Sequence, residues 1–391
     1  MKNLWSDEEV KKFETDLDLR VYTSNLLGQS DELVLHGGGN TSVKVEVDDE
    51  DILYVKGSGW DLVSIKKEGF APVKLEALWE MAKLPTLSDA NMVMLQKAAM
   101  IDKKAPNPSV EAILHAIIPF KFVDHTHADA VVTLSNSING IETIQKLYPN
   151  FLIIPYVMPG FVLAQMIYKK TKELDWSKCA GIILHNHGIF TFDDDAKKSY
   201  TKMIDAVTRA EQFLSENAKI TLKLSSSKKE IDTQKLQKII SQHKGTPICL
   251  HVNRSNLAYT YASQKELSSF TCRGVLTPEH IIRTKRKPLV LLDDDFEGAI
   301  EQYIAEYQEY FETFARDEIC LNPAPNYAVV KDYGVIAFGK DAKEASIIND
   351  IVEHTMLAVL RADMLGGYKS ISLTESFAME YWELEQAKLR K

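Results

Sequence analysis

The chain has 391 residues and a formal net charge of −9, from 46 Lys and Arg against 55 Asp and Glu. Hydrophobic residues make up 45% and charged residues 26%, a balance that excludes a disordered chain and a fibrous repeat. At about 150 residues per domain, this length predicts two or three domains, each able to bury a core. No Lys/Arg-rich run offsets the acidity, so we expect no nucleic-acid partner.

Cysteine usage and the N-terminus indicate a cytoplasmic protein. Four cysteines are scattered along the chain without a C-x-x-C spacing: Cys179, Cys249, Cys272 and Cys320. This pattern predicts neither a disulfide framework nor a thiolate zinc site. The first residues turn acidic at once and lack the apolar core of a signal peptide. Residues 151–168 are uncharged, but Pro155, Pro159 and Gly160 divide them into a strand, a turn and a helix start, so we expect no membrane span.

Helical and strand-like patterns alternate over residues 1–222, which we expect to form one domain of α/β class. In chain order, the expected elements are a helix (16–27), strands (32–35, 41–47 and 52–55), helices (89–99 and 109–118), strands (120–124, 131–134, 152–156 and 181–184) and a long amphipathic helix (196–218).

The composition then changes. Residues 223–245 are expected to hold a linker, marked by the small and charged run 225–230, followed by a helix. Residues 246–391 are expected to form a smaller C-terminal α/β domain with terminal helices. Its expected elements are strands (247–252, 288–292, 328–330 and 335–338) and helices (296–315, 342–365 and 376–389). An aromatic stripe at helical spacing is expected to be core or interface: Tyr303, Tyr307, Tyr310 and Phe311.

Two His-X-His pairs follow apolar strand-like segments and are the strongest chemical signal in the chain. His125-Thr126-His127 comes directly after residues 120–124, and His185-Asn186-His187 follows residues 181–184. Residues two apart on an extended segment point to the same face, so both imidazoles of the first pair can reach one ion. The second pair offers a third nitrogen ligand, and three protein ligands with one open position define a catalytic zinc site.

Three carboxylates lie near the first histidine pair in the sequence. Asp124 and Asp129 flank it, either as residues that orient a ring or as solvated or capping groups. Upstream, Ser109 suits an N-cap, which puts Glu111 in the first helical turn and His115 four residues later on the same face. Alone, Glu111 would be an acid that complements the helix dipole. Beside a divalent metal it can shuttle a proton to and from a carbon.

Two Gly-rich turns, 37–42 and 56–59, carry small hydroxyl or amide residues. Such turns can expose backbone N–H groups to an anion, although neither fits the Walker or dinucleotide pattern. They are either hairpin turns or phosphate-binding loops. Lys56 either adds a positive charge to the second loop or is a surface residue.

Together and in this order, these motifs resemble the class II aldolase/adducin family over about residues 10–220. The resemblance is carried by Gly38-Gly39-Asn40-Thr41-Ser42, Ser58-Gly59, Pro108-Ser109-Val110-Glu111, His125-Thr126-His127 and His187-Gly188. It implies a three-layer αβα domain with a central, mainly antiparallel sheet. It also implies a homo-oligomer, in several of the family's aldolases a tetramer.

The resemblance implies a role for each matching residue. His125, His127 and His187 would bind Zn²⁺ or another divalent metal, and Glu111 would be the catalytic acid/base. The substrate and its phosphate would be bound by Asn40, Thr41, Ser58, Gly59 and Ser109. Sugar-phosphate aldolases often have a second Ser just before the Glu, and Val110 in that position removes one donor from the pocket.

Segments 276–285 and 381–385 resemble the aldolase half of bifunctional rhamnulose-1-phosphate aldolase/alcohol dehydrogenases. In those proteins a short-chain dehydrogenase domain follows. No G-x-x-x-G-x-G turn follows a strand in this chain, so we expect no dehydrogenase domain. The sequence then represents either a stand-alone aldolase or a truncated piece of a bifunctional enzyme.

These expectations combine into a carbon–carbon lyase, a class II aldolase that cleaves a ketose 1-phosphate such as rhamnulose 1-phosphate to dihydroxyacetone phosphate and an aldehyde. A ketose-phosphate 4-epimerase or a metal-dependent dehydratase would need much the same three histidines. A non-catalytic interaction module, as in adducin, is the alternative from a different class. In that module the scaffold persists without the metal site.

Overall fold

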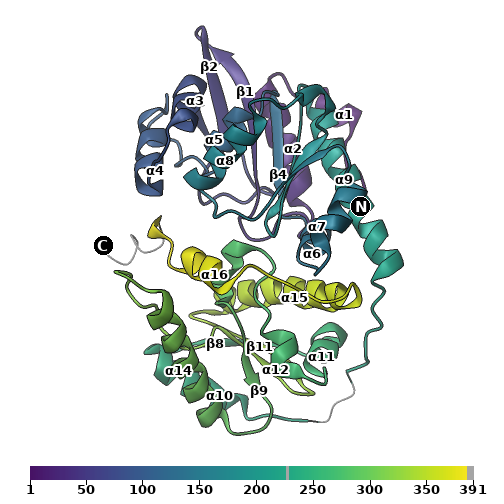
Figure 1. Cartoon of the computed structure of the whole chain (residues 1–391), viewed down its shortest axis with the longest axis vertical. Helices are drawn as coiled ribbons and strands as arrows, with labels where there is room; N and C mark the ends of the chain where they lie inside the picture. The colour runs from purple at the N-terminus through teal and green to yellow at the C-terminus, as the bar shows by residue number, and fades with distance from the viewer. Residues whose placement is uncertain (226–228, 385–391) are drawn as a thin grey trace. The chain divides into compact units, whose positions relative to one another are not determined.

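The computed structural model describes residues 1–225 and 229–384 and divides into two compact units (Figure 1). Unit 1 comprises Met1–Ser135 and Gly140–Phe213, and unit 2 comprises Asn136–Asn139 and Leu214–Lys391. The expected domain boundaries at residues 222 and 245 stay predictions. Half of the polar linker run 225–230, residues 226–228, lies outside the described residues.

A seven-stranded sheet in the order β3-β2-β1-β4-β7-β6-β5 forms the centre of unit 1. Its strands are β1 (Asn40–Val47), β2 (Glu50–Lys56), β3 (Phe70–Lys74), β4 (Phe122–Thr126), β5 (Phe151–Ile154), β6 (Gly181–Leu184) and β7 (Gly188–Asp193). Only β5 and β6 pair in parallel, and every other neighbour pair is antiparallel. The expected mainly antiparallel sheet is confirmed.

Helices cover both faces of this sheet, as Figure 1 shows for α5 and α9. On one face, α3 (Leu75–Lys83), α5 (Ala112–Ile117) and α8 (Phe161–Thr171) pack on a core that includes Val123 and Phe190. On the other face, α2 (Asp16–Gly28) and α9 (Ala196–Asn217) pack around Val43 and Phe122. The three-layer αβα arrangement is therefore confirmed. The remaining helices are α1 (Asp7–Val10), α4 (Asp89–Ala98), α6 (Asp129–Ser135) and α7 (Gly140–Leu147), with short 3-10 turns at Lys67–Gly69 and Trp176–Lys178.

Unit 2 is a smaller α/β unit around a four-stranded sheet in the order β8-β11-β10-β9. The strands are β8 (Cys249–Asn253), β9 (Leu289–Leu291), β10 (Tyr327–Val330) and β11 (Gly334–Gly339). Its helices are α10 (Thr233–Lys244), α11 (Asn256–Ala262), α12 (Leu267–Thr271), α13 (Ile281–Thr284), α14 (Phe296–Phe314), α15 (Ala342–Met364) and α16 (Leu373–Glu380), with a 3-10 turn at Pro278–His280. Helix α15 packs on β8 and β11, while α10 and α14 supply apolar side chains to the sheet core.

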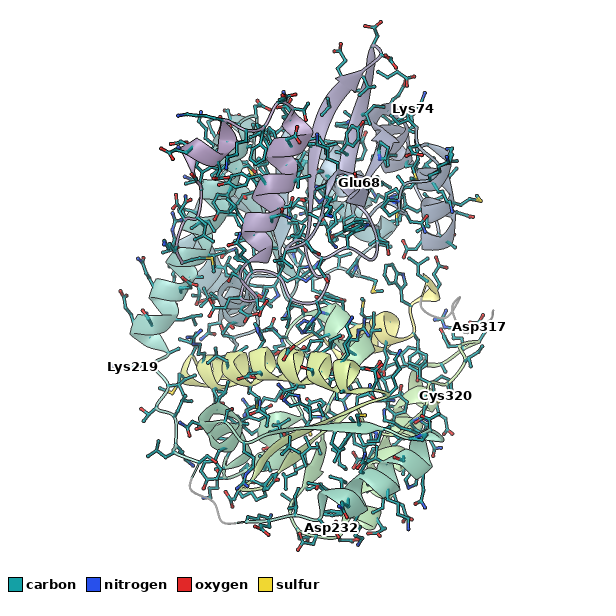
Figure 2. The ribbon with its side chains drawn as sticks, turned by 180° about the vertical axis from the view of Figure 1, so that it is seen from behind. Glu68, Lys74, Lys219, Asp232, Asp317 and Cys320 are labelled. Atoms are coloured by element: carbon teal, nitrogen blue, oxygen red, sulfur yellow. The ribbon has the colours of Figure 1, made fainter. Side chains whose placement is uncertain are left out.

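The aromatic stripe of α14 belongs to the interior of unit 2. Tyr303, Tyr307 and Tyr310 are buried, and Phe311 packs against the same cluster. Charged side chains instead cover the surface, among them Lys74 and Asp232 (Figure 2). No helix in the described part of the chain is both long enough and apolar enough to cross a membrane.

Two expected strands are wrong. Residues 32–33 lie in a turn and residues 34–35 have no regular structure, while residues 131–134 lie inside α6. A short apolar run cannot be distinguished from a buried helix segment by periodicity, and every residue of α6 after Asp129 is buried. Tertiary packing therefore overrides the β propensity of Val131 and Val132.

Two helix ends also differ from expectation. Helix α5 begins at Ala112, so Glu111 takes the N-cap position that was assigned to Ser109. Helix α16 ends at Glu380, and residues 385–389 of the expected helix lie outside the described residues.

Strands β3 and β7 and helix α3 were not expected. Strand β3 contains Pro72, which a strand tolerates at the edge of a sheet, where β3 lies.

Candidate metal centre and its carboxylate

Strand pairing at the centre of unit 1 brings distant residues together. In the β1–β4 pair Asn40 lies opposite His125, and in the β4–β7 pair His125 lies opposite Phe190. A tight turn joins β6 to β7, with Asn186 in the left-handed region at φ 57°. Asn tolerates this conformation, and the turn carries His187 back beside the end of β4.

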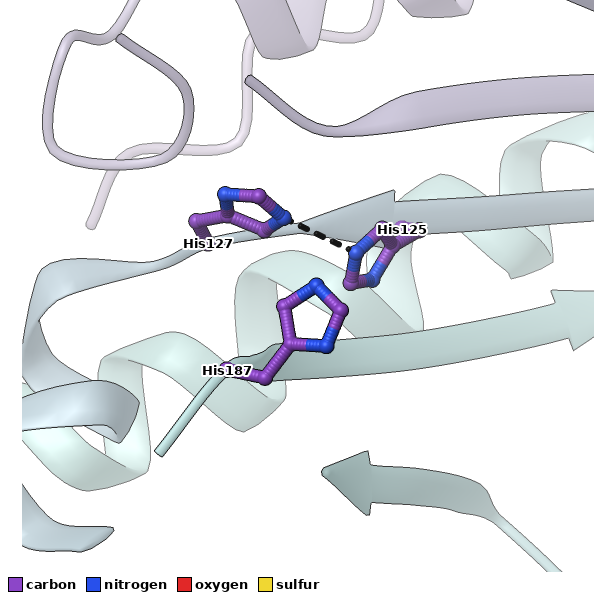
Figure 3. A group of neighbouring side chains, drawn as sticks. All are labelled: His125, His127 and His187. Atoms are coloured by element: carbon purple, nitrogen blue, oxygen red, sulfur yellow. Dashed lines mark hydrogen bonds between the residues drawn. The ribbon is translucent and has the colours of Figure 1, made fainter. Parts of the chain in front are cut away.

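The three histidines that were expected to bind a metal form one group. One ring nitrogen from each of His125, His127 and His187 lies within 4.8 Å of the others. The rings converge from the end of β4 and from the β6–β7 turn, and the Nε2 atoms of His125 and His127 are 3.0 Å apart (Figure 3). His185 is not part of this group, and its Nδ1 contacts the side-chain oxygen of Asn186.

The surroundings of the group suit a divalent cation. His125 Nδ1 donates to Ile189 O at 3.1 Å, so the lone pair of Nε2 faces the other two rings. The His125 ring stacks on Phe190 with 4.0 Å between centroids. A Cβ at Gly188 would lie 2.8 Å from His125 Cε1, so glycine gives the ring its place. Three imidazole nitrogens at this spacing are a donor set that Zn²⁺ and similar ions accept.

Glu111 places a buried carboxylate beside the three rings. Its Oε2 lies 3.5 Å from His125 Nε2 and its Oε1 lies 3.7 Å from His187 Nε2. Oε2 accepts a hydrogen bond from Asn40 Nδ2 at 2.6 Å. Oε1 is buried and has no hydrogen-bond partner among the residues that the structure describes. An orphaned carboxylate oxygen at this position is a further feature that suits a cation or a proton-transfer site.

Asp124, although adjacent to His125, points to the opposite face of the sheet. It pairs there with Arg20 and accepts from Ser199 Oγ. Arg20 and Asp124 are both fully buried. The structure therefore places Asp124 in a salt bridge behind β4 and not against a histidine ring.

Both units of the chain match known protein domains. Residues 20–214 match the class II aldolase and adducin N-terminal domain, and residues 228–389 match the second domain of class II aldolases. This chain belongs to the class II aldolase family. The N-terminal class II aldolase domain of a conserved protein from Thermoplasma acidophilum is 39% identical, with a TM-score of 0.51 over 55% of this chain and 99% of that one.

Two further relatives are less similar to this chain in sequence. The uncharacterized oxidoreductase YuxG of Bacillus subtilis is 28% identical over all of this chain, which spans 60% of that relative's length. An L-fuculose-1-phosphate aldolase from Thermus thermophilus is 15% identical over 51% of this chain and 92% of its own, with a TM-score of 0.33. The second likeness is too remote to bear on function.

Of the residues expected to bind the substrate and its phosphate, Asn40 contacts Glu111, and the other four fall into two groups. Ser58, Gly59 and Ser109 lie in two loops that pair directly. Ser58 N–H donates to Asn107 O at 2.8 Å, and Ser109 N–H donates to Lys56 O at 3.1 Å. Thr41 points away from these loops, and its hydroxyl lies 2.8 Å from Ser24 Oγ of α2.

Lys56 and His115 lie near Glu111 and Asn40, and their surroundings were not evident from the sequence. Lys56 is 6% exposed and donates to Gly37 O at 3.0 Å. Burial lowers the pKa of Lys56 to about 8, although the carboxylates of Asp61 and Glu111 oppose the change. His115 is fully buried and contacts Asn40. The glycines after Lys56 are the one sequence signal for its place, since they indicate a loop where backbone and ligand approach closely.

Proposed function

We propose that this class II aldolase chain is a metal-dependent carbon–carbon lyase that cleaves a ketose 1-phosphate, such as rhamnulose 1-phosphate, to dihydroxyacetone phosphate and an aldehyde. The observation that carries this proposal is the orphaned Oε1 of Glu111, 3.7 Å from His187 Nε2 in the three-histidine group. A carboxylate within reach of both a cation site and a reacting carbon suits proton transfer next to a carbonyl.

His125, His127 and His187 would hold the ion, with Zn²⁺ as the first choice because all three ligands are imidazoles. When bound, a divalent ion stabilises the negative charge that develops on the substrate's carbonyl oxygen. Each ring must be neutral to act as a ligand, so we expect binding to weaken below about pH 6.5, the ordinary pKa of histidine.

In the cleavage direction Glu111 would donate a proton to the nucleophilic carbon once the carbon–carbon bond has broken, while the hydroxyl proton of the departing aldehyde carbon passes to a second base or to water. In the reverse, condensation direction Glu111 would take that proton from the nucleophilic carbon. Its carboxylate is buried at 6% exposure, so bulk water does not compete at the reacting carbon. The substrate phosphate would lie over the paired loops, against the hydroxyls of Ser58 and Ser109 and the backbone of Gly59. The N–H groups of both serines already donate to carbonyls, and Ser109 Oγ accepts from Glu111 N–H at 3.2 Å. The hydroxyl hydrogens of both serines and the remaining N–H donors of Lys56, which also donates to Gly37 O, would face the anion.

The test is to load the chain with Zn²⁺, incubate it with a panel of ketose 1-phosphates, and measure release of dihydroxyacetone phosphate. We expect release from at least one member. Glu111→Gln should keep the metal and lose cleavage by two orders of magnitude or more, since a general base contributes about 10²–10⁴-fold. No release from any member, or full activity in metal-loaded Glu111→Gln, would contradict the proposal. An epimerised or dehydrated product would assign the site to one of those reactions.

A further inference from the structure

Three side chains connect Glu111 to the interior of unit 1 in series. Ser42 Oγ lies 2.7 Å from His115 Nδ1, His115 Nε2 contacts Asn40 Oδ1, and Asn40 Nδ2 lies 2.6 Å from Glu111 Oε2. All four residues are buried, and Ser42 and His115 are fully so. We refer to Ser42, His115 and Asn40 as the positioning chain.

The hydrogen bond from Asn40 Nδ2 to Glu111 Oε2 sets the direction of every other hydrogen bond in the positioning chain. A carboxylate accepts, so Asn40 must turn its N–H₂ to Glu111 and its Oδ1 to His115. His115 Nε2 must then carry a proton and donate to Asn40. His115 Nδ1 is left as an acceptor, and the Ser42 hydroxyl donates to it. The reverse orientation would set oxygen against oxygen at Asn40.

His115 suits this role because it is held as a neutral ring. Burial is the largest cause that lowers the pKa of His115 well below its ordinary value, and charge on His125, Lys44 and Arg20 acts in the same direction. Lys44 Nζ also donates to His115 O at 2.9 Å and to Ile118 O at 2.6 Å, which fixes the C-terminal end of α5. A neutral imidazole has one donor and one acceptor nitrogen, as the hydrogen bonds of the positioning chain require.

The two oxygens of Glu111 are therefore unequal. Oε2 accepts a hydrogen bond from Asn40, whereas Oε1 has no hydrogen-bond partner among the described residues and faces His187. We propose that Asn40, His115 and Ser42 are positioning residues that anchor Oε2 and leave Oε1 as the oxygen that carries the proton. This inference rests on the proposed function, and it moves Asn40 from phosphate binding to orientation of the acid/base.

Loss of a hydrogen bond in the positioning chain should lower kcat and leave KM nearly unchanged. The Glu111 carboxylate would lose its fixed orientation, while the phosphate loops would stay intact. We expect His115→Leu to lower kcat by about 10–100-fold, the range for residues that orient a metal-site group. His115→Gln should recover part of that loss, because its amide can still donate to Asn40 Oδ1. Ser42→Ala should show a smaller loss.

Ser24→Ala is the matched control for Ser42→Ala. Ser24 is equally buried and its hydroxyl bonds to Thr41, the neighbour of Ser42, on the other face of the sheet. We expect this variant to keep wild-type kcat. If His115→Leu keeps wild-type kcat with the metal bound, or if Ser24→Ala and Ser42→Ala lose equal activity, the inference is wrong.

A second measurement does not depend on turnover. In protein labelled with ¹⁵N-histidine and free of metal, the ring of His115, assigned by its absence in His115→Gln, should show a protonated Nε2 and an unprotonated Nδ1. Asn40→Leu should abolish this preference. An Nδ1–H tautomer or a charged ring at pH 7 would overturn the positioning chain. If the wild type cleaves no substrate but the His115 tautomer is as expected, the proposed function is wrong and the hydrogen bonds of the positioning chain are still supported.

Discussion

The ring of His125 lies against Gly188 so closely that a Cβ on the glycine would be 2.8 Å from His125 Cε1 and 2.4 Å from Thr126 O. Both distances are below van der Waals contact, and the second atom belongs to the backbone of β4. The turn from β6 to β7 therefore leaves space for the ring by omitting a side chain. The position of the His125 ring in the three-histidine group therefore depends on the glycine that follows His187 in the sequence.

Gly188→Ala is expected to lower metal affinity by about tenfold or more, because the His125 ring must move to admit the methyl group. A competition titration with a chromophoric chelator measures the effect. Gly245→Ala is the control, since a Cβ there meets nothing within 4 Å. It should cost about 1 kcal/mol of unfolding free energy from its left-handed backbone and leave metal affinity unchanged. Unchanged affinity in Gly188→Ala would contradict the prediction.

His187→Ala and His185→Ala form a matched pair. His187 belongs to the three-histidine group, whereas His185, two residues earlier, lies outside it. Removal of one of three nitrogen ligands should weaken Zn²⁺ binding by at least about 100-fold, by analogy with the strong dependence of such sites on ligand number. Isothermal titration with Zn²⁺ separates the variants, and equal losses in both would show that the wrong histidine has been assigned.

The buried pair of Arg20 and Asp124 predicts an unequal response to single and double substitution. Arg20→Met should destabilise the protein by about 3–5 kcal/mol, because it leaves an uncompensated charge in the core behind β4. Arg20→Met with Asp124→Asn should cost less than the two single changes together. Chemical denaturation measures each free energy of unfolding. Lys197→Met, which breaks the exposed pair with Asp7, should have no measurable effect, and a strictly additive double variant would refute the coupling.

Lys56 predicts a specific dependence of stability on pH. Its pKa is about 8 in the folded chain against an ordinary 10.5, so between these values the unfolded state binds more protons. The unfolding free energy therefore rises with pH across this window, by up to about 1.4 kcal/mol per pH unit from this group. Below about pH 7 both states are almost fully protonated and the contribution is constant.

The prediction for Lys56 is checked by the difference in unfolding free energy between the wild type and Lys56→Met. Denaturation of the wild type and of Lys56→Met from pH 6 to 10 should give curves whose separation is constant up to about pH 7 and then changes, most steeply above about pH 8, with the wild type gaining stability relative to the variant. Other groups that titrate in this range contribute equally to both proteins. Parallel curves throughout would mean that Lys56 titrates normally.

The identity of the site could be predicted from local sequence because its chemistry is local. His125 lies in β4 and His127 directly follows its last residue, and this extended spacing of two places both rings on one face. The bounds of β6 were also predicted, because a continuous apolar run ends there at a turn. The order of the surrounding motifs indicated the class II aldolase family that residues 20–214 match.

Relations between residues far apart in sequence could not be predicted in this way. Asn40 and His115 are 75 positions apart, and only the pairing of β1 with β4 and the packing of α5 on β1 bring them into contact with Glu111. Thr41 lies next to Asn40, yet the alternation of the strand turns it to the other face.

The sequence by itself determined the set of chemical groups: three imidazoles, a carboxylate and two Gly-rich loops, in a chain of mixed α/β pattern. The tertiary structure decided which of these groups meet, which face each one occupies, and which are buried. Burial is a property of the whole packed unit, so the lowered pKa of Lys56 and the neutral state of His115 follow from neighbours on other elements and from no feature of the residues themselves.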